Sequence, residues 1–316
     1  MAIDILTGPY IKGLSFTAMT EPWRLIGDVG GTNVRFARSD SSADIHDQWV
    51  APVDRYQTFA AALTEYLGRV GNGAQASAAV IAAAGPVADG EIRLTNSSWR
   101  ICERELATLL GPGVATRLVN DLEAVAFALP HLPENRLQFA DLRPRVRDAR
   151  QRMLAVNVGT GFGSASLIRD GERWVCCPSE SGHMRLAADN AEELALFSKL
   201  EIGQATVEDI LSGGGLQRLQ AHVAEARPEF GYQYFTGFLA RACADLVLAS
   251  AAWDGLYLCG SVATAWWQRA DLDEFRRLFV GTSKMSHQLR ATPIALIDAE
   301  LPALIGLAHL NVGHAD

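Results

Sequence analysis

The sequence predicts an α/β protein made of two similar domains. Two β-hairpins with turns rich in Gly and Thr occupy residues 25–38 and 154–167, far apart in the chain. Each consists of a short apolar strand, a tight turn and a second strand. After each hairpin, helical apolar spacing alternates with short apolar runs, as in α/β folds. With 316 residues, the chain is long enough for two hydrophobic cores, so we expect a duplicated domain.

Composition and charge limit the partners that the protein can bind. The net charge is −8, with no compensating run of Lys or Arg, which argues against a nucleic-acid partner. The five cysteines have neither the spacing nor the His partners of a zinc site. Residues 1–21 lack the order of a signal peptide, and no apolar run reaches membrane-spanning length. We therefore expect a cytoplasmic protein with no membrane partner.

The first half is predicted to continue with helices and buried strands. Its elements are, in order, a helix over 56–70, a strand over 78–84, a helix over 101–110 and a strand over 116–119. Gly85-Pro86 ends the first of these strands in a turn. Asp121 is well placed to cap a helix that runs to residue 129.

The second half repeats the alternation after its own hairpin. Helices are predicted over 191–200, 207–211, 235–252 and 301–310, and strands over 255–259 and 293–297. Gly260-Ser261 follows the first of these strands and precedes another helix, an order typical of helix N-termini that receive phosphates. We expect the last helix to pack on the first domain.

The two glycine turns are candidate phosphate sites. Successive backbone N–H groups and a Thr hydroxyl at such a turn can surround phosphate oxygens. Asp28 directly precedes the first turn, and a carboxylate beside phosphates can hold Mg²⁺ through its waters. An ordinary turn-forming Asp is the alternative. The Walker motif and the HRD and DFG elements of protein kinases are absent.

Asp121 is the candidate general base. It follows a predicted strand and opens a helix, and phosphoryl transfer to an alcohol needs a carboxylate that accepts the hydroxyl proton. The alternative is that it only caps the helix.

Polar clusters at 94–99 and 178–183 have the side chains that pair with sugar hydroxyls. In the second cluster Glu180 and His183 lie three residues apart, so both can face one ligand. Such a pair is more often structural, and no third residue supports a zinc site.

These motifs together resemble the bacterial glucokinase family, over nearly the whole chain from residue 25 to residue 310. The resemblance rests on GDVGGTN (27–33), TNSSW (95–99), NDLEA (120–124), GTGFG (159–163), ESGH (180–183), EIG (201–203) and LSGGGL (211–216). It implies an α/β fold of the hexokinase, actin and Hsp70 superfamily, in which two ribonuclease-H-like (actin-like ATPase) domains flank a deep cleft. We expect a small domain of residues 1–119 plus 300–316 and a large domain of residues 120–299.

The resemblance also implies a reaction, ATP-dependent phosphorylation of glucose to glucose 6-phosphate, with Asp121 as the base. Glucose hydroxyls would be bound by Asn96, Asn120, Asp121, Glu180, His183 and Glu201. ATP would be held by Gly27, Asp28, Val29, Gly30, Gly31, Thr32, Asn33, Gly159, Thr160, Gly161 and Gly163, with Gly260 near the adenosine. Asp28 would hold Mg²⁺ through water. The family often forms homodimers, so a homodimer is expected.

A few positions depart from the family pattern. Ser181 stands where the family commonly has Gly, between two implied sugar ligands. Asn157 and Ser261 also replace frequent glycines, and residues 282–284 read Thr-Ser-Lys where Lys-Gly-Arg is often seen. A hexokinase for another hexose such as mannose or fructose is therefore the alternative, and a non-catalytic sugar sensor is the third. The cysteine-rich zinc motif of ROK-type sugar kinases is absent.

Overall fold

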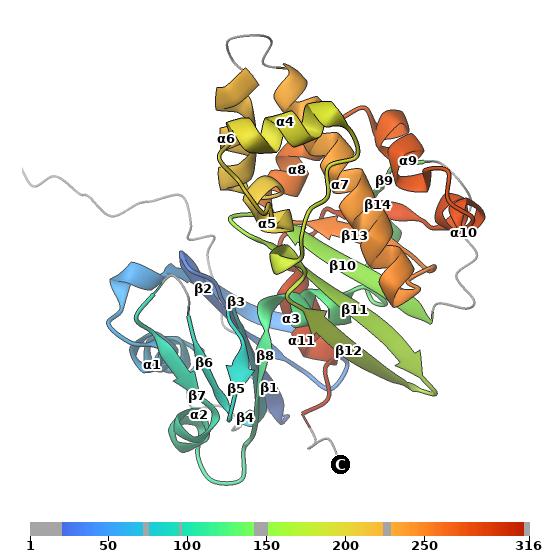
Figure 1. Cartoon of the computed structure of the whole chain (residues 1–316). Coiled ribbons are helices and arrows are strands. Elements are labelled where there is room, and N and C mark those ends of the chain that lie inside the picture. Colours follow the sequence, from blue (N-terminus) through green and yellow to red (C-terminus); the bar gives the residue numbers. More distant parts are fainter. Residues whose placement is uncertain (1–20, 72–75, 95–96, 142–150, 224–228, 313–316) are drawn as a thin grey trace, which may run out of the picture. The chain divides into compact units, whose positions relative to one another are not determined.

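The computed structural model describes residues 21–71, 76–94, 97–141, 151–223 and 229–312 (Figure 1). The chain forms two compact units. Unit 1 comprises Met1–Ala128 with Leu301–Asp316, and unit 2 comprises Leu129–Glu300. The boundary after residue 119 expected from the sequence thus lies at Ala128 instead, because the helix that follows packs with the C-terminal helix of unit 1.

Unit 1 is built on a five-stranded sheet of order β3-β2-β1-β4-β8. The strands are β1 (Trp23–Val29), β2 (Asn33–Ser39), β3 (Ile45–Pro52), β4 (Ala76–Ala83) and β8 (Ala115–Asn120). The first three are antiparallel, whereas β1, β4 and β8 are parallel. The carboxyl ends of the three parallel strands therefore meet at one edge of the sheet.

The helices described in unit 1 are α1 (Phe59–Val70), α2 (Glu103–Leu110), α3 (Asp121–Ala128) and α11 (Pro302–His309), together with the 3₁₀ turn η1 (Val53–Arg55). A small sheet contains β5 (Val87–Ala88), β6 (Glu91–Arg93) and β7 (Arg100–Cys102). The helix expected from residue 101 begins at Glu103, because Ile101 pairs with Ile92 across the small sheet. The Thr58 hydroxyl accepts the Ala61 N–H and caps α1.

The large sheet of unit 1 has a core on each face. An aromatic cluster of Phe36, Trp49 and Tyr66 packs with α1 on one face. On the other face, Ile26 and Val80 pack against α3 and α11. A Cβ added at Gly306 of α11 would lie 1.8 Å from the Ala124 carbonyl oxygen of α3. Only glycine allows these two helices to approach so closely.

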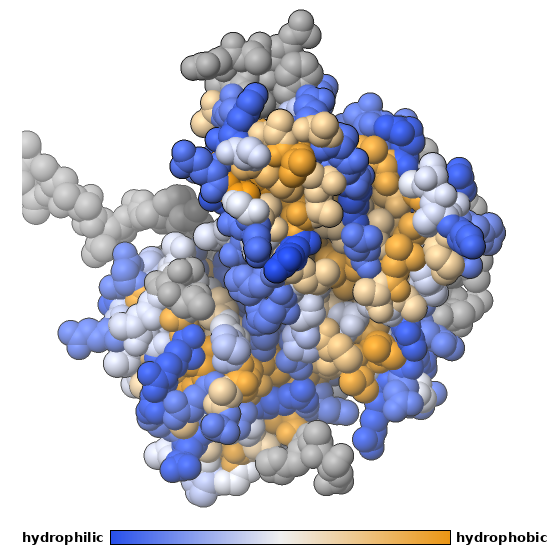
Figure 2. Space-filling view, viewed as in Figure 1, coloured by the Kyte–Doolittle hydropathy of each residue, from blue (hydrophilic) through white to orange (hydrophobic). Residues whose placement is uncertain are grey.

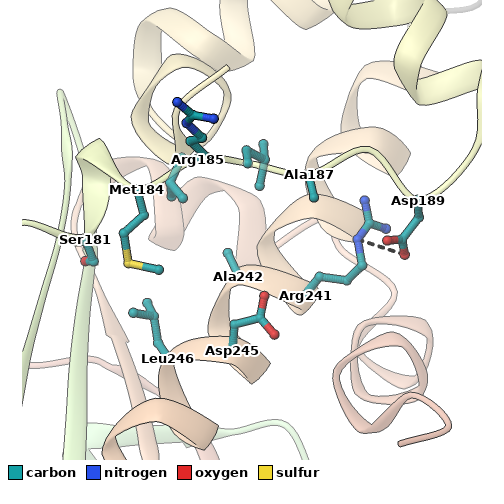
Figure 3. Close-up of a pocket in the computed structure, with 11 residues that line it drawn as sticks. Ser181, Met184, Arg185, Ala187, Asp189, Arg241, Ala242, Asp245 and Leu246 are labelled. Atoms are coloured by element: carbon teal, nitrogen blue, oxygen red, sulfur yellow. Dashed lines mark ion pairs between the residues drawn. The ribbon is translucent and has the colours of Figure 1, made fainter. Parts of the chain in front are cut away.

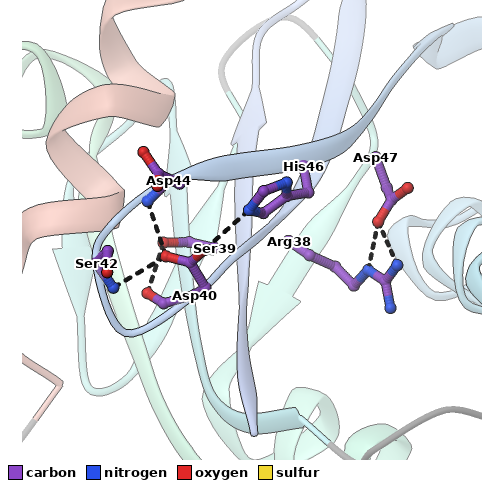
Figure 4. Close-up of polar contacts among 7 residues, drawn as sticks. All are labelled: Arg38, Ser39, Asp40, Ser42, Asp44, His46 and Asp47. Carbon is purple, nitrogen blue, oxygen red and sulfur yellow. Dashed lines mark hydrogen bonds and ion pairs between the residues drawn. The ribbon is translucent and has the colours of Figure 1, made fainter. Parts of the chain in front are cut away.

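The connection between β2 and β3 carries a polar cluster (Figure 4). The Asp40 carboxylate accepts the backbone N–H groups of Ser42 and Asp44 and pairs with His46. Arg38 has a side chain that is 1% exposed and is ion-paired with Asp47. A buried charge is tolerated only with such a partner, so this pair forms part of the interior of unit 1.

Unit 2 is built on a six-stranded sheet of order β12-β11-β10-β13-β14-β9. The strands are β9 (Leu137–Phe139), β10 (Arg152–Val158), β11 (Phe162–Asp170), β12 (Arg173–Ser179), β13 (Leu256–Cys259) and β14 (Ile294–Ile297). The hairpin strand β10 pairs antiparallel with β11 and parallel with β13. The hairpin strand β1 of unit 1 pairs in the same two ways with β2 and β4, so the two sheets share this arrangement.

The helices of unit 2 are α4 (Ala191–Lys199), α5 (Val207–Ile210), α6 (Gly213–Val223), α7 (Glu229–Ser250), α8 (Ser261–Trp267), α9 (Leu272–Val280) and α10 (Ser286–Ala291), with 3₁₀ turns η2 (Glu134–Arg136) and η3 (Ser181–His183). The helix expected over 235–252 is longer at its N-terminal end, and α6, α9 and α10 were not expected. The Trp266 indole N–H donates to the Thr236 hydroxyl in the hydrophobic core of unit 2.

Figure 2 shows apolar residues gathered over α4 and α7, where Leu194 of α4 is 61% exposed. Within the described ranges, no helix is both long and apolar enough to span a bilayer.

Candidate active site

Asp28 stands at the carboxyl edge of the sheet in unit 1. It is the residue before last of β1, and in the hairpin register it lies opposite Arg35 of β2. The Arg35 guanidinium donates to Oδ2 of Asp28 at 3.0 Å. Burial raises the pKa of Asp28, and the charge of Arg35 acts in the opposite direction. Arg35 therefore orients the carboxylate and partly compensates for its burial.

Asp121 lies at the same edge, at the start of α3. It follows Asn120, the last residue of β8, and β4 lies between β8 and β1 in the sheet. Burial raises the pKa of Asp121, and the nearby negative charge of Asp28 raises it further. A carboxylate whose pKa is raised by burial and by a like charge is a typical acid–base group.

Asn120 holds this edge together. Its Nδ2 donates to the Gly85 carbonyl at 3.2 Å, and its Oδ1 accepts the Leu122 N–H at 2.9 Å. The Asp121 carboxylate also accepts the Leu122 N–H, at 2.8 Å. The side chains of Asn120 and Asp121 therefore both cap the N-terminus of α3. The Asn120 amide is hydrogen-bonded to the backbone through both its nitrogen and its oxygen.

The first glycine turn follows Asp28 directly. The Gly30 N–H donates to the Asn33 carbonyl, and the Thr32 carbonyl accepts the Val53 N–H. Gly31 and Thr32 at the tip are exposed, whereas Gly27 and Val29 are buried within the sheet. A Cβ added at Gly27 would lie 2.7 Å from the Ile81 side chain. Packing therefore accounts for Gly27, and the exposed tip is the part that can meet a ligand.

The second glycine turn, in unit 2, is held from three sides. Gly213, the first residue of α6, donates its N–H to the Gly159 carbonyl at 2.9 Å, and Glu208 accepts the Phe162 N–H at 2.7 Å. Gly260 adopts φ 98° and precedes α8. A Cβ there would lie 2.4 Å from Oδ1 of Asn157, so only glycine fits beside the end of β10. Thr160 remains exposed at the tip.

Ser181–His183 of the ESGH segment form the 3₁₀ turn η3. Residues 180–184 are here called the sugar loop, after the glucose contacts that the sequence predicts for them. The His183 N–H donates to the Glu180 carbonyl at 3.0 Å, which places these two exposed residues one turn apart. Ser181 between them is 1% exposed. Its hydroxyl donates to the Ser164 hydroxyl of β11 at 2.8 Å.

A cavity of about 100 Å³ lies beside the sugar loop (Figure 3). Ser181 and Met184 line one side, and Arg241 and Asp245 of α7 line another. Arg241 is ion-paired with Asp189 at 3.2 Å. The cavity therefore separates the sugar loop from the long helix of unit 2.

Glu201 has a backbone conformation that is unusual for its residue type. It follows α4 with φ 57°. The Ile202 N–H donates to the Phe197 carbonyl and the Glu201 N–H to the Ser198 carbonyl, which is a Schellman motif with Glu at the position that favours glycine. The strain at this exposed residue points to a use for its side chain.

The structure brings together only part of the predicted set. Asp28, Asn120 and Asp121 lie at one edge of the sheet in unit 1. In unit 2, Gly260 lies against the end of β10, and Glu208 lies against both the second glycine turn and the sugar loop. Glu201 is on a separate element of unit 2, and Asn96 lies outside the described residues. Sequence reasoning missed Arg35, although hairpin register was a signal for it. It also missed Glu208, because Glu208 lies 46 residues from Phe162 and no local pattern in the sequence links the two.

The donor set at Asp28 fits Mg²⁺ held through water. Arg35 takes only the Oδ2 atom, and the described residues contain no group of three or more His, Cys, Asp or Glu side chains that could hold a metal. A single carboxylate supplemented by waters and phosphate oxygens is the usual surrounding of Mg²⁺ at nucleotide sites. A dedicated all-protein metal cage is not what these residues form.

The chain is similar to glucokinases in both sequence and structure. The glucokinase family model matches residues 25–233 and 231–314. The glucokinase of Chromobacterium violaceum is 32% identical over 92% of this chain and 90% of its own length. A crystal structure of glucokinase from an Antarctic psychrotroph superposes with a TM-score of 0.80 at 26% identity, covering 91% of this chain and 98% of that one. A ROK family glucokinase from Streptomyces griseus, solved with glucose and AMPPNP, has a TM-score of 0.59 at 18% identity, covering 91% and 98%, which shows the shared fold alone. The chain belongs to the glucokinase family.

Proposed function

We propose that the protein transfers the terminal phosphoryl group of ATP to the 6-hydroxyl of glucose. The observation that carries the proposal is the pair of carboxylates, Asp28 and Asp121, at the carboxyl edge of the parallel strands in a glucokinase family member. Asp28 would hold Mg²⁺ beside the phosphates, and Asp121 would accept the proton of the alcohol. We further propose that two ribonuclease-H-like domains, small and large, flank the substrates in a cleft.

Asp121 is the proposed general base. Its carboxylate accepts the proton of the 6-hydroxyl as the new O–P bond forms and the bond to the ADP oxygen breaks. Burial and the charge of Asp28 raise its pKa, which makes the carboxylate a better proton acceptor than an exposed Asp. The Asn120 bonds to the Gly85 carbonyl and the Leu122 N–H fix where α3 starts, and hence where the base lies.

The two glycine turns are the proposed phosphate contacts. Exposed Gly31, Thr32 and Thr160 offer backbone N–H groups and hydroxyls to phosphate oxygens. Asp28 is the residue that would hold Mg²⁺ through water, and the metal when bound supplies neutralisation of phosphate charge. Gly260, which allows close approach beside Asn157, is the proposed neighbour of the adenosine.

The remaining site residues are proposed glucose ligands. Glu180 and His183 are exposed on one turn of the sugar loop, and exposed Glu201 stands in its strained conformation. Asn96 and Asn120 complete the proposed set. A homodimeric, cytoplasmic protein is part of the same proposal.

A coupled assay for glucose 6-phosphate, with ATP and Mg²⁺, tests the proposal. Asp121→Asn keeps the shape and the bond from Leu122 but removes the proton acceptor, so kcat should fall by about 10²–10⁴-fold. Glucose affinity should stay within about tenfold, because the amide still reaches the same hydroxyl. Glu123→Gln, on the same helix and bonded to Arg117, is the control that should keep kcat. Near-normal turnover in Asp121→Asn would remove Asp121 from the role of base.

The identity of the buried residue in the sugar loop favours a second candidate, a hexokinase for another hexose. Ser181 lies between Glu180 and His183 in the sequence, where the family commonly has Gly, and its buried hydroxyl donates to the Ser164 hydroxyl. Comparing kcat/KM for glucose, mannose and fructose separates the two. Glucose should be preferred under the main proposal, and a higher value for either other sugar would replace it.

A further inference from the structure

Glu208 joins two segments of unit 2 that the proposed reaction uses. It is the second residue of α5, and its Oε2 accepts the Phe162 N–H at 2.7 Å, across 46 residues of chain. We propose that Glu208 is a positioning residue that holds the second glycine turn and the sugar loop in one fixed arrangement. The inference rests on the proposed function, in which these segments contact ATP and glucose.

The carboxylate of Glu208 is packed against a glycine from each segment. A Cβ added at Gly161, in the turn, would lie 2.5 Å from its Oε2. A Cβ added at Gly182, in the sugar loop, would lie 3.3 Å from the same oxygen and 2.3 Å from the Phe162 carbonyl oxygen. Such distances exclude any larger residue at either position without a shift. The two glycines therefore allow one carboxylate to contact both segments.

The helix that carries Glu208 is itself bonded to the sugar loop. The Val207 N–H donates to the Met184 carbonyl at 2.8 Å. Thr206 and Asp209 form a capping box that fixes the first turn of α5. On the other side of the loop, Ser181 is bonded to Ser164 of β11. The sugar loop is thus held between α5 and β11, and Glu208 links α5 to the turn that starts β11.

The charge of Glu208 supports a holding role over contact with ATP. A carboxylate beside phosphates is unfavourable where no metal ion lies between them, because like charges repel. The same carboxylate has an oxygen in place to accept a backbone N–H. By engaging the Phe162 N–H, Glu208 fixes the turn and leaves the exposed Thr160 at its tip for the ligand.

Two substitutions at Glu208 separate the hydrogen bond from the charge. Glu208→Ala removes the acceptor and should raise the KM for ATP roughly tenfold, with a rise in the KM for glucose. Glu208→Gln retains an oxygen acceptor and should keep both KM values within about twofold. Asp271→Ala, the control, removes a carboxylate that accepts one backbone N–H at the start of α9 in the same unit. It should lower the Tm by a few degrees and leave both KM values unchanged.

Hydrogen exchange gives a readout that does not depend on activity. Glu208→Ala should speed exchange in residues 159–163 and in residues 180–184 together, and Glu208→Gln should not. Unchanged exchange and KM in Glu208→Ala would overturn the proposal, as would equal impairment in Glu208→Gln, which would assign the effect to the charge. If the wild type lacked sugar kinase activity, the proposed function would fail, while exchange would still decide whether Glu208 joins the two segments.

Discussion

At the scale of single residues, Asp121 and Asp28 occupy positions that stability alone does not favour. Each is buried enough for its pKa to be raised, and the charge of Asp28 adds to the shift at Asp121. A raised pKa in the folded state means that ionisation opposes folding. These carboxylates are therefore kept at the expense of stability, which is common where charges act in chemistry.

Asp121→Asn should therefore stabilise the metal-free protein at pH 7, by about 1 kcal/mol. Protonated Asp121 is not charged, so the wild type is most stable at low pH and loses stability as pH rises through the raised pKa of Asp121. The difference in the free energy of unfolding between the variant and the wild type should therefore shrink as pH falls through that pKa. Urea unfolding at several pH values, without Mg²⁺ or nucleotide, measures this difference. Asp44→Asn, at an exposed carboxylate of unit 1, is the control and should not be stabilised at pH 7. A variant no more stable than the wild type at pH 7 would contradict the argument.

Glu201 also occupies a position that stability does not favour, in this case because of its backbone conformation. Its φ of 57° is a conformation that glycine adopts without strain. Glu201→Gly should raise the free energy of unfolding by about 1 kcal/mol and raise the KM for glucose. Denaturation and steady-state kinetics on the same sample test both effects. Glu201→Gln keeps the strain, so it should leave stability near the wild type; a stabilised Glu201→Gln would show that strain is not the cause.

At the scale of elements, a buried ion pair joins the strands β2 and β3. Arg38 lies over the Trp23 ring at 5.5 Å and is paired with Asp47, with side-chain exposures of 1% and 3%. Removing one member of a buried pair leaves an uncompensated charge, which costs several kcal/mol. The pair is therefore a sensitive point of unit 1 that lies outside the proposed machinery.

Asp47→Ala should destabilise the protein by about 3–5 kcal/mol and leave the kcat of the remaining folded molecules unchanged. Glu105→Ala, which breaks an exposed pair with Arg100, should cost less than about 1 kcal/mol. Urea denaturation and active-site titration measure the two quantities. Equal losses in the two variants would show that burial does not set the strength of the Arg38 pair.

At the scale of the whole molecule, the C-terminal segment of the chain completes unit 1. Arg24 of β1 donates to the carbonyls of Ala308 and Leu310, across 284 and 286 residues. Helix α11 packs on α3, and Gly306 permits their contact. The C-terminal segment is thus part of unit 1, and its loss would expose the core face formed by Ile26 and Val80.

Local patterns in the sequence predicted both glycine hairpins, most helices and the parallel strands β4, β8, β13 and β14, but missed β3, β5, β6, β7, β9 and β12. Turn residues and apolar periodicity act over a few positions, so they are visible without a structure. The start of α2 was misplaced because Ile101 has its pairing partner in β6. Helices α6, α9 and α10 were missed; α6 begins with three glycines, which weaken a helical pattern.

By itself, the sequence determined the hairpins, the acidic residues at Asp28 and Asp121, and the family resemblance, because these reside in short contiguous motifs. The tertiary structure alone decided that Asp28 and Asp121 influence one another, that α3 belongs to unit 1, and that Glu208 meets Gly161 and Gly182. Strand order and helix packing create those contacts between distant residues. Burial and hydrogen bonding then depend on the folded arrangement, which no local pattern specifies.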